Sequence, residues 1–147
     1  MKLCSACLLG VKCRYDGQSK PNEKILELAR RETLIPVCPE QLGGQPTPRP
    51  DAEIRGGDGK AVLNGTAKVV ESSSRDVTAE FIAGAEEVLK LAKLFGATEV
   101  ISKQKSPSCG CGQIYDGTFS KKMITGDGVT AALLKENGLT VISDEQL

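Results

Sequence analysis

The chain has 147 residues, of which 39% are hydrophobic and 26% charged, proportions typical of a globular protein with a core of its own. Nineteen basic and nineteen acidic residues cancel and only 3% of the residues are aromatic, which argues against a nucleic-acid-binding surface. No apolar run is long enough to span a bilayer and the N-terminal residues lack the layout of a signal peptide, so we expect a cytoplasmic protein.

Six cysteines and the absence of histidine narrow the chemistry of any site. Structural disulfides are rare in the cytoplasm, so the cysteines are interpreted as metal ligands, redox thiols or nucleophiles. Without histidine, zinc sites that need imidazole, Cys–His pairs and Ser–His triads are excluded. Ligation by sulfur alone favours zinc or an iron–sulfur cluster.

The first part of the chain predicts two short strands around a helix. Residues 2–6 are apolar enough for a buried strand. Asn22 is suited to cap a helix that ends near Glu32, because apolar residues recur there at helical spacing. Residues 34–38 predict a second strand, although they contain a proline.

The composition then changes. Residues 39–60 are rich in Gly, Pro and charge, and they predict a long irregular loop. Residues 61–70 predict a β-hairpin that turns at Asn64-Gly65.

The second half of the chain predicts helices alternating with strands. In order, the expected elements are a long helix from Asp76 or Thr78 to Gly96, a strand over 98–102, a short hairpin or irregular lid over 114–124, a helix from Thr125 or Asp127 to Gly138, and a strand over 139–142.

Short strands separated by amphipathic helices predict an α/β fold: one domain over residues 1–147, with a mainly parallel sheet flanked by helices and a hairpin insertion. In such sheets, ligands bind beyond the carboxyl ends of the strands. Cys7, Cys38 and Cys109 each come just after a predicted strand. We therefore expect these three thiols to meet in one crevice.

Three thiolates would leave one iron of a 4Fe–4S cluster without a protein ligand, because such clusters normally take four. An open iron is a Lewis acid that favours sulfur, so the pattern indicates chemistry on sulfur-containing molecules. A fully ligated cluster would instead indicate electron transfer.

Other interpretations of the cysteines stay open. Each thiol is also compatible with a small buried hydrophobic residue, which is the interpretation we favour for Cys4. Cys13 suits a structural thiol or a fourth ligand, and Cys111 suits a ligand or a packing residue. A zinc site would combine Cys4 and Cys7 with Cys109 and Cys111, whereas a redox dithiol would use Cys4 and Cys7 alone.

Several longer motifs lie in order along the chain: residues 5–10 (SACLLG), 13–17 (CRYDG), 38–50 (from CPE to PTPRP), 105–110 (KSPSCG) and 115–119 (YDGTF). Together they resemble the bacterial domain-of-unknown-function family that includes thiouracil desulfurase. The resemblance runs from about residue 2 to the last predicted helix. It implies a 4Fe–4S cluster on Cys7, Cys38 and Cys109, and non-redox removal of sulfur from a small thiolated substrate such as 2-thiouracil.

Five further residues are candidates for roles beside the cluster. Glu40 is the carboxylate nearest to a ligand and would pass protons. Ser106 and Ser108 would hydrogen-bond the substrate or the cluster sulfur, and Arg14 and Arg49 would hold a carbonyl or anionic group. Their ordinary alternatives are a helix-start carboxylate, turn caps and salt bridges.

Two functions of different classes follow. The first is an iron–sulfur desulfurase that acts on a small thiolated molecule, as a monomer or homodimer without membrane or nucleic-acid partners. The second is a non-catalytic binding module that holds an iron–sulfur cluster or zinc.

Overall fold

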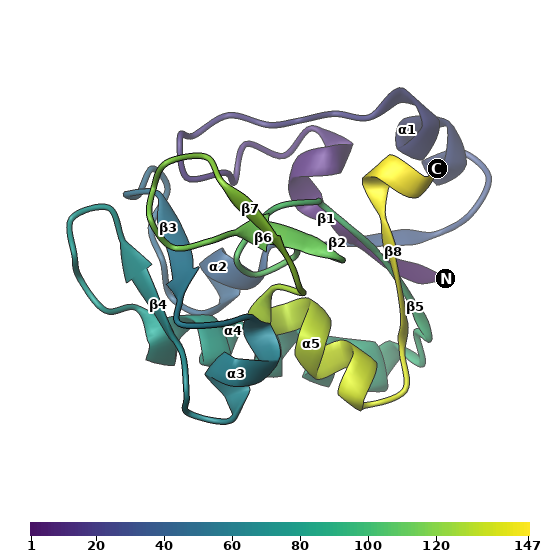
Figure 1. Cartoon of the computed structure of the whole chain (residues 1–147). Helices are drawn as coiled ribbons and strands as arrows, with labels where there is room; N and C mark the ends of the chain where they lie inside the picture. Colours follow the sequence, from purple (N-terminus) through teal and green to yellow (C-terminus); the bar gives the residue numbers. More distant parts are fainter.

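The computed structural model describes residues 1–147 and has a parallel four-stranded sheet at its centre (Figure 1). The strands pair in the order β2-β1-β5-β8, so β1 and β5 occupy the middle. Their bounds are Lys2–Ser5 (β1), Leu34–Val37 (β2), Glu99–Ser102 (β5) and Thr140–Ser143 (β8). The predicted α/β fold is confirmed.

Helices cover both faces of this sheet, because alternate residues of its central strands point to opposite sides. Leu3 and Val100 pack in a core cluster with α4 and α5, whereas Cys4 and Ile101 pack in a second cluster with η1 and α1. The bounds of these helices are Ala6–Leu9 (η1), Glu23–Ala29 (α1), Thr78–Phe95 (α4) and Val129–Glu136 (α5). No helix of the structure has both the length and the apolar character needed to cross a membrane.

Two predicted helix ends follow the expected capping chemistry, whereas the predicted starts of α4 and α5 do not. Asp76 or Thr78 was expected to cap α4, but its N-cap is Val77. Asn22 Oδ1 accepts hydrogen bonds from the backbone N–H groups of Lys24 (3.0 Å) and Ile25 (3.3 Å), as predicted for the α1 cap. Gly96 ends α4 in a left-handed conformation. The start of α5 was predicted at Thr125 or Asp127 but is Gly128, which has no side chain to cap with.

The predicted irregular loop at residues 39–60 is wrong, because it contains regular elements. They are α2 (Pro39–Leu42), β3 (Ala52–Arg55) and the start of α3 (Gly59–Leu63).

The hairpin predicted at residues 61–70 is also wrong in its pairing. Strand β4 (Lys68–Glu71) pairs antiparallel with β3, and Asn64 ends helix α3 instead of forming a hairpin turn. Asp58 caps α3 by accepting from the N–H of Ala61 at 3.0 Å, and Val62 is buried in a core cluster. Burial of Val62 in the core therefore outweighs the tendency of the apolar residues 61–63 to form a strand.

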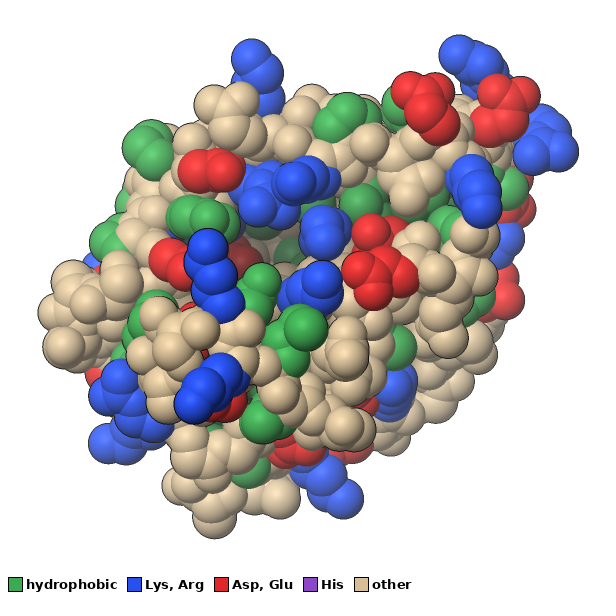
Figure 2. All heavy atoms as spheres, turned by 45° about the horizontal axis from the view of Figure 1, so that its top comes forward, with side chains coloured by type: hydrophobic (Ala, Val, Ile, Leu, Met, Phe, Trp, Pro, Cys, Tyr) green, Lys and Arg blue, Asp and Glu red, His purple; other side chains and the backbone are tan.

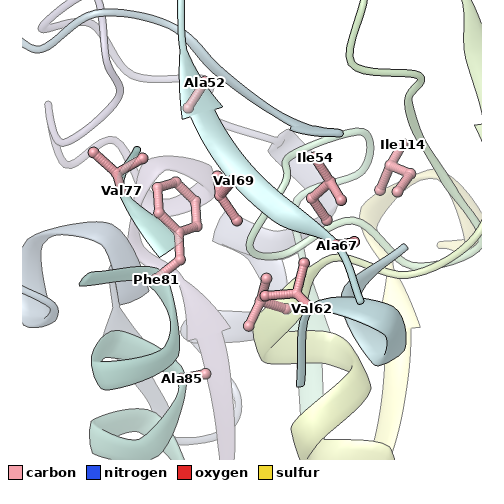
Figure 3. Packing of buried hydrophobic residues seen from close by; sticks show 10 residues of the cluster. Ala52, Ile54, Val62, Ala67, Val69, Val77, Phe81, Ala85 and Ile114 are labelled. Atoms are coloured by element: carbon pink, nitrogen blue, oxygen red, sulfur yellow. The ribbon is translucent and has the colours of Figure 1, made fainter. Parts of the chain in front are cut away.

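That third core cluster lies between the β3–β4 pair and the helices α3, α4 and α5 (Figure 3). It also receives Ile114 from β6 (Gln113–Tyr115), which packs near Ile54 of β3. Strand β6 pairs with β7 (Met123–Thr125), so the hairpin alternative for residues 114–124 is confirmed.

Candidate functional site

The carboxyl ends of β1, β2 and β5 face a cavity of about 450 Å³. Cys7 lies in η1 directly after β1, Cys38 follows β2, and Cys109 lies in the loop after β5. All three line this cavity, and Cys7 and Cys109 are each only 8% exposed. The space-filling view in Figure 2 shows a hollow on this side of the molecule.

A fourth thiol, that of Cys13, also lines the cavity. It lies among the same lining residues as Cys7 and Cys38, and Cys38 Sγ donates to the Cys13 carbonyl oxygen at 3.7 Å. Sulfur is therefore concentrated on one wall of the cavity.

The remaining two cysteines lie elsewhere. Cys4 is fully buried in the core on the α1 side of the sheet. Cys111 Sγ lies 3.5 Å from the Val141 carbonyl oxygen and packs against the hydrophobic core on the other face of the sheet, which α4 and α5 cover. Neither lines the cavity, so the fold does not assemble the zinc set of Cys4 and Cys7 with Cys109 and Cys111.

Without metal, the thiols of Cys13, Cys38 and Cys109 are held in their protonated form, because the pKa of each is raised. Burial raises the pKa of Cys109 to about 12. The contact with the Cys13 thiol, in which Cys38 keeps the proton, raises the pKa of Cys38 together with burial. For Cys13, the lowering effect of the bond with Cys38 is outweighed by the bond with Cys7 and by burial, and its pKa is raised to about 11. Binding of metal by these thiols therefore releases protons.

The loop that carries Cys109 is held by its own serines and by helix α5. Ser106 Oγ accepts from the N–H groups of Ser108 (3.0 Å) and Cys109 (3.1 Å), which is a capping role. Ser108 is 1% exposed, and its Oγ lies 2.7 Å from Thr130 Oγ1 of helix α5. Ser106 lines the cavity, whereas Ser108 does not.

Gln104 fixes the other end of this loop and was missed by sequence reasoning. Its Nε2 donates to the Cys111 carbonyl (2.7 Å) and to Ser143 Oγ (2.9 Å), while its Oε1 accepts from the Cys111 N–H (2.9 Å). One amide thereby ties the loop to the end of β8. No sequence signal marks this residue, because its partners are set only by the fold.

The position of Cys38 depends on a close crossing of α2 and α4. A Cβ added at Gly84 of α4 would lie 2.0 Å from the Pro39 carbonyl oxygen, and one added at Gly43 would lie 2.1 Å from the Glu80 carbonyl oxygen. Two glycines therefore let the backbones touch. Since Cys38 immediately precedes α2, this contact places its thiol.

Arg49 and Glu40 form an ion pair in the cavity wall, with Nε donating to Oε1 at 3.0 Å. Arg49 is only 3% exposed in its side chain and also donates to the carbonyls of Cys13 (2.9 Å) and Pro46 (3.1 Å). Burial raises the pKa of Glu40, although Arg49 acts in the opposite direction. Arg49 is thus occupied by protein partners.

Arg14, in contrast, has donor capacity left at the cavity. Its Nε is buried without a hydrogen-bond partner, and the nearest carboxylate oxygen, Asp16 Oδ1, is 3.7 Å away. Buried donors of this kind are rare in folded proteins, so Arg14 is suited to bind a ligand oxygen.

Aromatic side chains gather at the same cavity. Of the five aromatic residues in the chain, Tyr15, Tyr115 and Phe119 line it, whereas Phe81 is in the core and Phe95 is exposed. Their flat faces suit a planar ring. The low aromatic content of the sequence gave no sign of this concentration.

Charged residues also line the cavity, and Figure 2 shows Lys and Arg side chains around the hollow. Burial raises the pKa of two lining carboxyls, Asp51 and Glu53. The lining lysines are Lys20, Lys103, Lys105 and Lys121.

Comparisons with known proteins agree with this geometry. The model of the 2-thiouracil desulfurase family matches residues 3–146. The uncharacterized protein YbbK of Bacillus subtilis strain 168 is 54% identical over 147 residues, covering 100% of this chain and 97% of that protein. The solved structure of the 4Fe–4S-dependent thiouracil desulfidase TudS superposes with a TM-score of 0.87 at 44% identity, covering 99% of this chain and 91% of the other. The chain belongs to the 2-thiouracil desulfurase family, as its motifs predicted.

Proposed function

We propose that this protein is a 4Fe–4S-dependent desulfurase that converts the thiocarbonyl of a small planar molecule such as 2-thiouracil into a carbonyl. One water supplies the oxygen, the sulfur leaves as hydrogen sulfide, and no atom changes its oxidation state. The observation that carries the proposal is the convergence of Cys7, Cys38 and Cys109 from three strand ends on one cavity. The family membership and the name of the TudS structure support it.

The residues present fit such a cluster. The donor set consists of thiols from three separate loops and contains no imidazole, as expected for iron–sulfur ligation. No three Cys, Asp or Glu side chains are arranged to hold a single metal ion. When bound on Cys7, Cys38 and Cys109, the cluster supplies a Lewis-acidic iron with affinity for the substrate sulfur.

The protein's own side chains would bind and orient the ring. Tyr15, Tyr115 and Phe119 provide flat apolar surface for its faces. The unpartnered Nε of Arg14 would donate to a ring carbonyl oxygen. This bond would remove the free-energy cost of a buried N–H group that has no acceptor. These contacts favour a small planar substrate with a polar edge.

Glu40 is the side chain best placed to move a proton. Its Oε1 is occupied by Arg49 Nε, so Oε2 is the oxygen that would take a proton from the attacking water and return it to the departing sulfide. Burial raises the pKa of this carboxyl, which brings it closer to the neutral range. Ser106, Ser108 and Arg49 would act by positioning the cysteines and Glu40 rather than by touching substrate.

The test is an anaerobic reconstitution with iron and sulfide, followed by incubation with 2-thiouracil. We expect uracil and sulfide to form in equal amounts with the wild type, and neither to form with Cys38→Ala. Cys4→Ala is the matched control, because Cys4 is a buried cysteine outside the cavity. A wild-type protein that holds iron and sulfide but forms no uracil would support the non-catalytic module instead.

A further inference from the structure

Glu53 is a buried carboxylate at the cavity to which the mechanism above gives no role. It lies in β3, is 4% exposed, and has its neighbours Ala52 and Ile54 in the core cluster. Since successive residues of a strand point to opposite faces, Glu53 faces away from that core and towards the cavity.

The partners of Glu53 are two backbone donors from a distant loop. Its Oε1 accepts from the N–H groups of Gly117 (3.0 Å) and Phe119 (3.1 Å). Both belong to residues 116–122, which connect β6 to β7 and are here called the β6–β7 loop. A single carboxylate oxygen thereby fastens this loop to β3.

The backbone of the β6–β7 loop lies directly on β3, and this is seen independently at Gly117. A Cβ added there would come within 2.5 Å of the Ile54 carbonyl oxygen and 2.9 Å of Arg55 Cα, and the φ of Gly117 is +92°. No other residue fits this contact without moving the loop.

The rest of the β6–β7 loop has few ties to the protein body. Thr118 and Lys121 are exposed, and the Asp116 carboxylate is used within the loop, accepting from the Thr118 N–H at 3.0 Å. Below the loop, Ile114 packs near Ile54 and anchors the base of the hairpin (Figure 3). Above that base, the polar ties to β3 are the two bonds of Glu53 and a longer one, from Arg55 Nη2 to the Gly117 carbonyl oxygen at 3.4 Å.

We propose that Glu53 is a positioning residue that latches the β6–β7 loop onto β3 and thereby holds Tyr115 and Phe119 in the cavity wall that receives the substrate ring. The ring-binding part of this inference rests on the proposed function, whereas the latch is a property of the chain alone. Glu53 acts through the loop backbone and does not itself contact the ring.

Two substitutions of Glu53 distinguish the loss of its hydrogen bonds to the loop from the loss of its negative charge. Glu53→Ala leaves two N–H donors without an acceptor and releases the loop, whereas Glu53→Gln keeps an amide oxygen that can accept the same two bonds. Gly117→Ala displaces the loop while Glu53 stays intact. Glu71→Ala is the control, because it removes another buried glutamate (4% exposed), on β4, that does not line the cavity.

The first measurement is limited trypsin digestion of the cluster-free chain, with cleavage after the exposed Lys121 and Lys122 identified by intact mass. We expect cleavage there to be about tenfold faster in Glu53→Ala and Gly117→Ala, because either change weakens or removes the two bonds that hold the loop, and unchanged in Glu53→Gln. Equal cleavage in Glu53→Ala and wild type, or equal acceleration in Glu71→Ala, would overturn the latch.

The second measurement is 2-thiouracil turnover by the reconstituted proteins. We expect the KM of Glu53→Ala to rise about tenfold with kcat within about a factor of two, since ring binding is lost but the reacting groups stay in place, and Glu53→Gln to restore the wild-type KM. An unchanged KM in Glu53→Ala would overturn the positioning role. If the wild type forms no uracil, the proposed function and the positioning role fail together, and the digestion still decides the latch.

Discussion

Arg49 Nε lies 3.0 Å from Glu40 Oε1, and the same guanidinium donates to the carbonyl of Cys13 at 2.9 Å. One buried side chain therefore connects the helix that follows Cys38 with the loop that carries Cys13. A planar fork of five N–H donors can serve several acceptors at fixed angles, which a lysine cannot do.

This pair predicts a large effect of Arg49→Met on stability. The substitution leaves the Glu40 charge and two backbone carbonyls without a partner, and we expect the free energy of unfolding in urea to fall by about 3 kcal/mol. Arg30→Met is the control, because Arg30 is 75% exposed and pairs only with Glu27. Its loss should stay below about 1 kcal/mol, and equal losses for the two variants would contradict the structural role.

Glu40→Gln should separate proton transfer from folding. The amide oxygen can still accept from Arg49, so the urea midpoint should change little, while kcat falls about a hundredfold or more. Burial raises the pKa of Glu40 above the ordinary 4.5, and the ionised form is needed to take a proton from water. The wild-type rate should therefore fall as the pH drops through this raised pKa. A residual rate of Glu40→Gln with the same acid limb would exclude Glu40 as the source of that limb.

Single cysteine substitutions should divide into two groups. We expect Cys7→Ala, Cys38→Ala and Cys109→Ala to lose bound iron and sulfide and the broad absorption at about 400 nm after anaerobic reconstitution. Cys4→Ala and Cys111→Ala should retain both, because these two side chains do not line the cavity. Full iron content in any of the first three variants would remove that residue from the ligand set.

Gly84→Ala should destabilise the protein, against the usual preference of helices for alanine. At an exposed helix site the change from glycine to alanine stabilises by about 1 kcal/mol. At Gly84 the new methyl would lie 2.0 Å from the Pro39 carbonyl oxygen, so we expect a net loss of about 1–3 kcal/mol in urea unfolding. Ala83→Gly, at the exposed neighbouring position, measures the effect of helix propensity on stability without a steric contact. A stabilising Gly84→Ala would show that α2 moves away freely.

Glu53 predicts how stability depends on pH. Burial raises its pKa above 4.5, so the folded chain binds a proton at pH values where the unfolded chain has released it. Its contribution to stability is complete below pH 4.5 and declines as the pH rises through the raised pKa. Glutamine does not titrate, so the unfolding free energy of Glu53→Gln relative to wild type should increase from pH 4.5 towards neutrality. A difference that is constant or falls with pH would contradict the buried, ionisable state of Glu53.

The strands of the central sheet could be predicted because their signals are local. Residues 2–6, 34–38, 98–102 and 139–142 each contain enough apolar residues to mark a buried strand, and all four were found within about a residue of their expected bounds. The segment 39–71 could not be predicted in this way. Its strand β3 is defined by pairing with β4, and no local pattern shows which partner a short strand will find.

The sequence by itself determined the α/β class, the family, and the order of strand followed by cysteine that brings Cys7, Cys38 and Cys109 together. Parallel strands of one sheet end at the same edge, so a pattern along the chain was enough to place these thiols. Only the tertiary structure decided that Gln104 and Glu53 hold the cavity loops and that Arg49 is committed to protein partners. Their hydrogen bonds join residues up to 66 positions apart, and polar contacts between distant segments leave no periodic trace in a sequence.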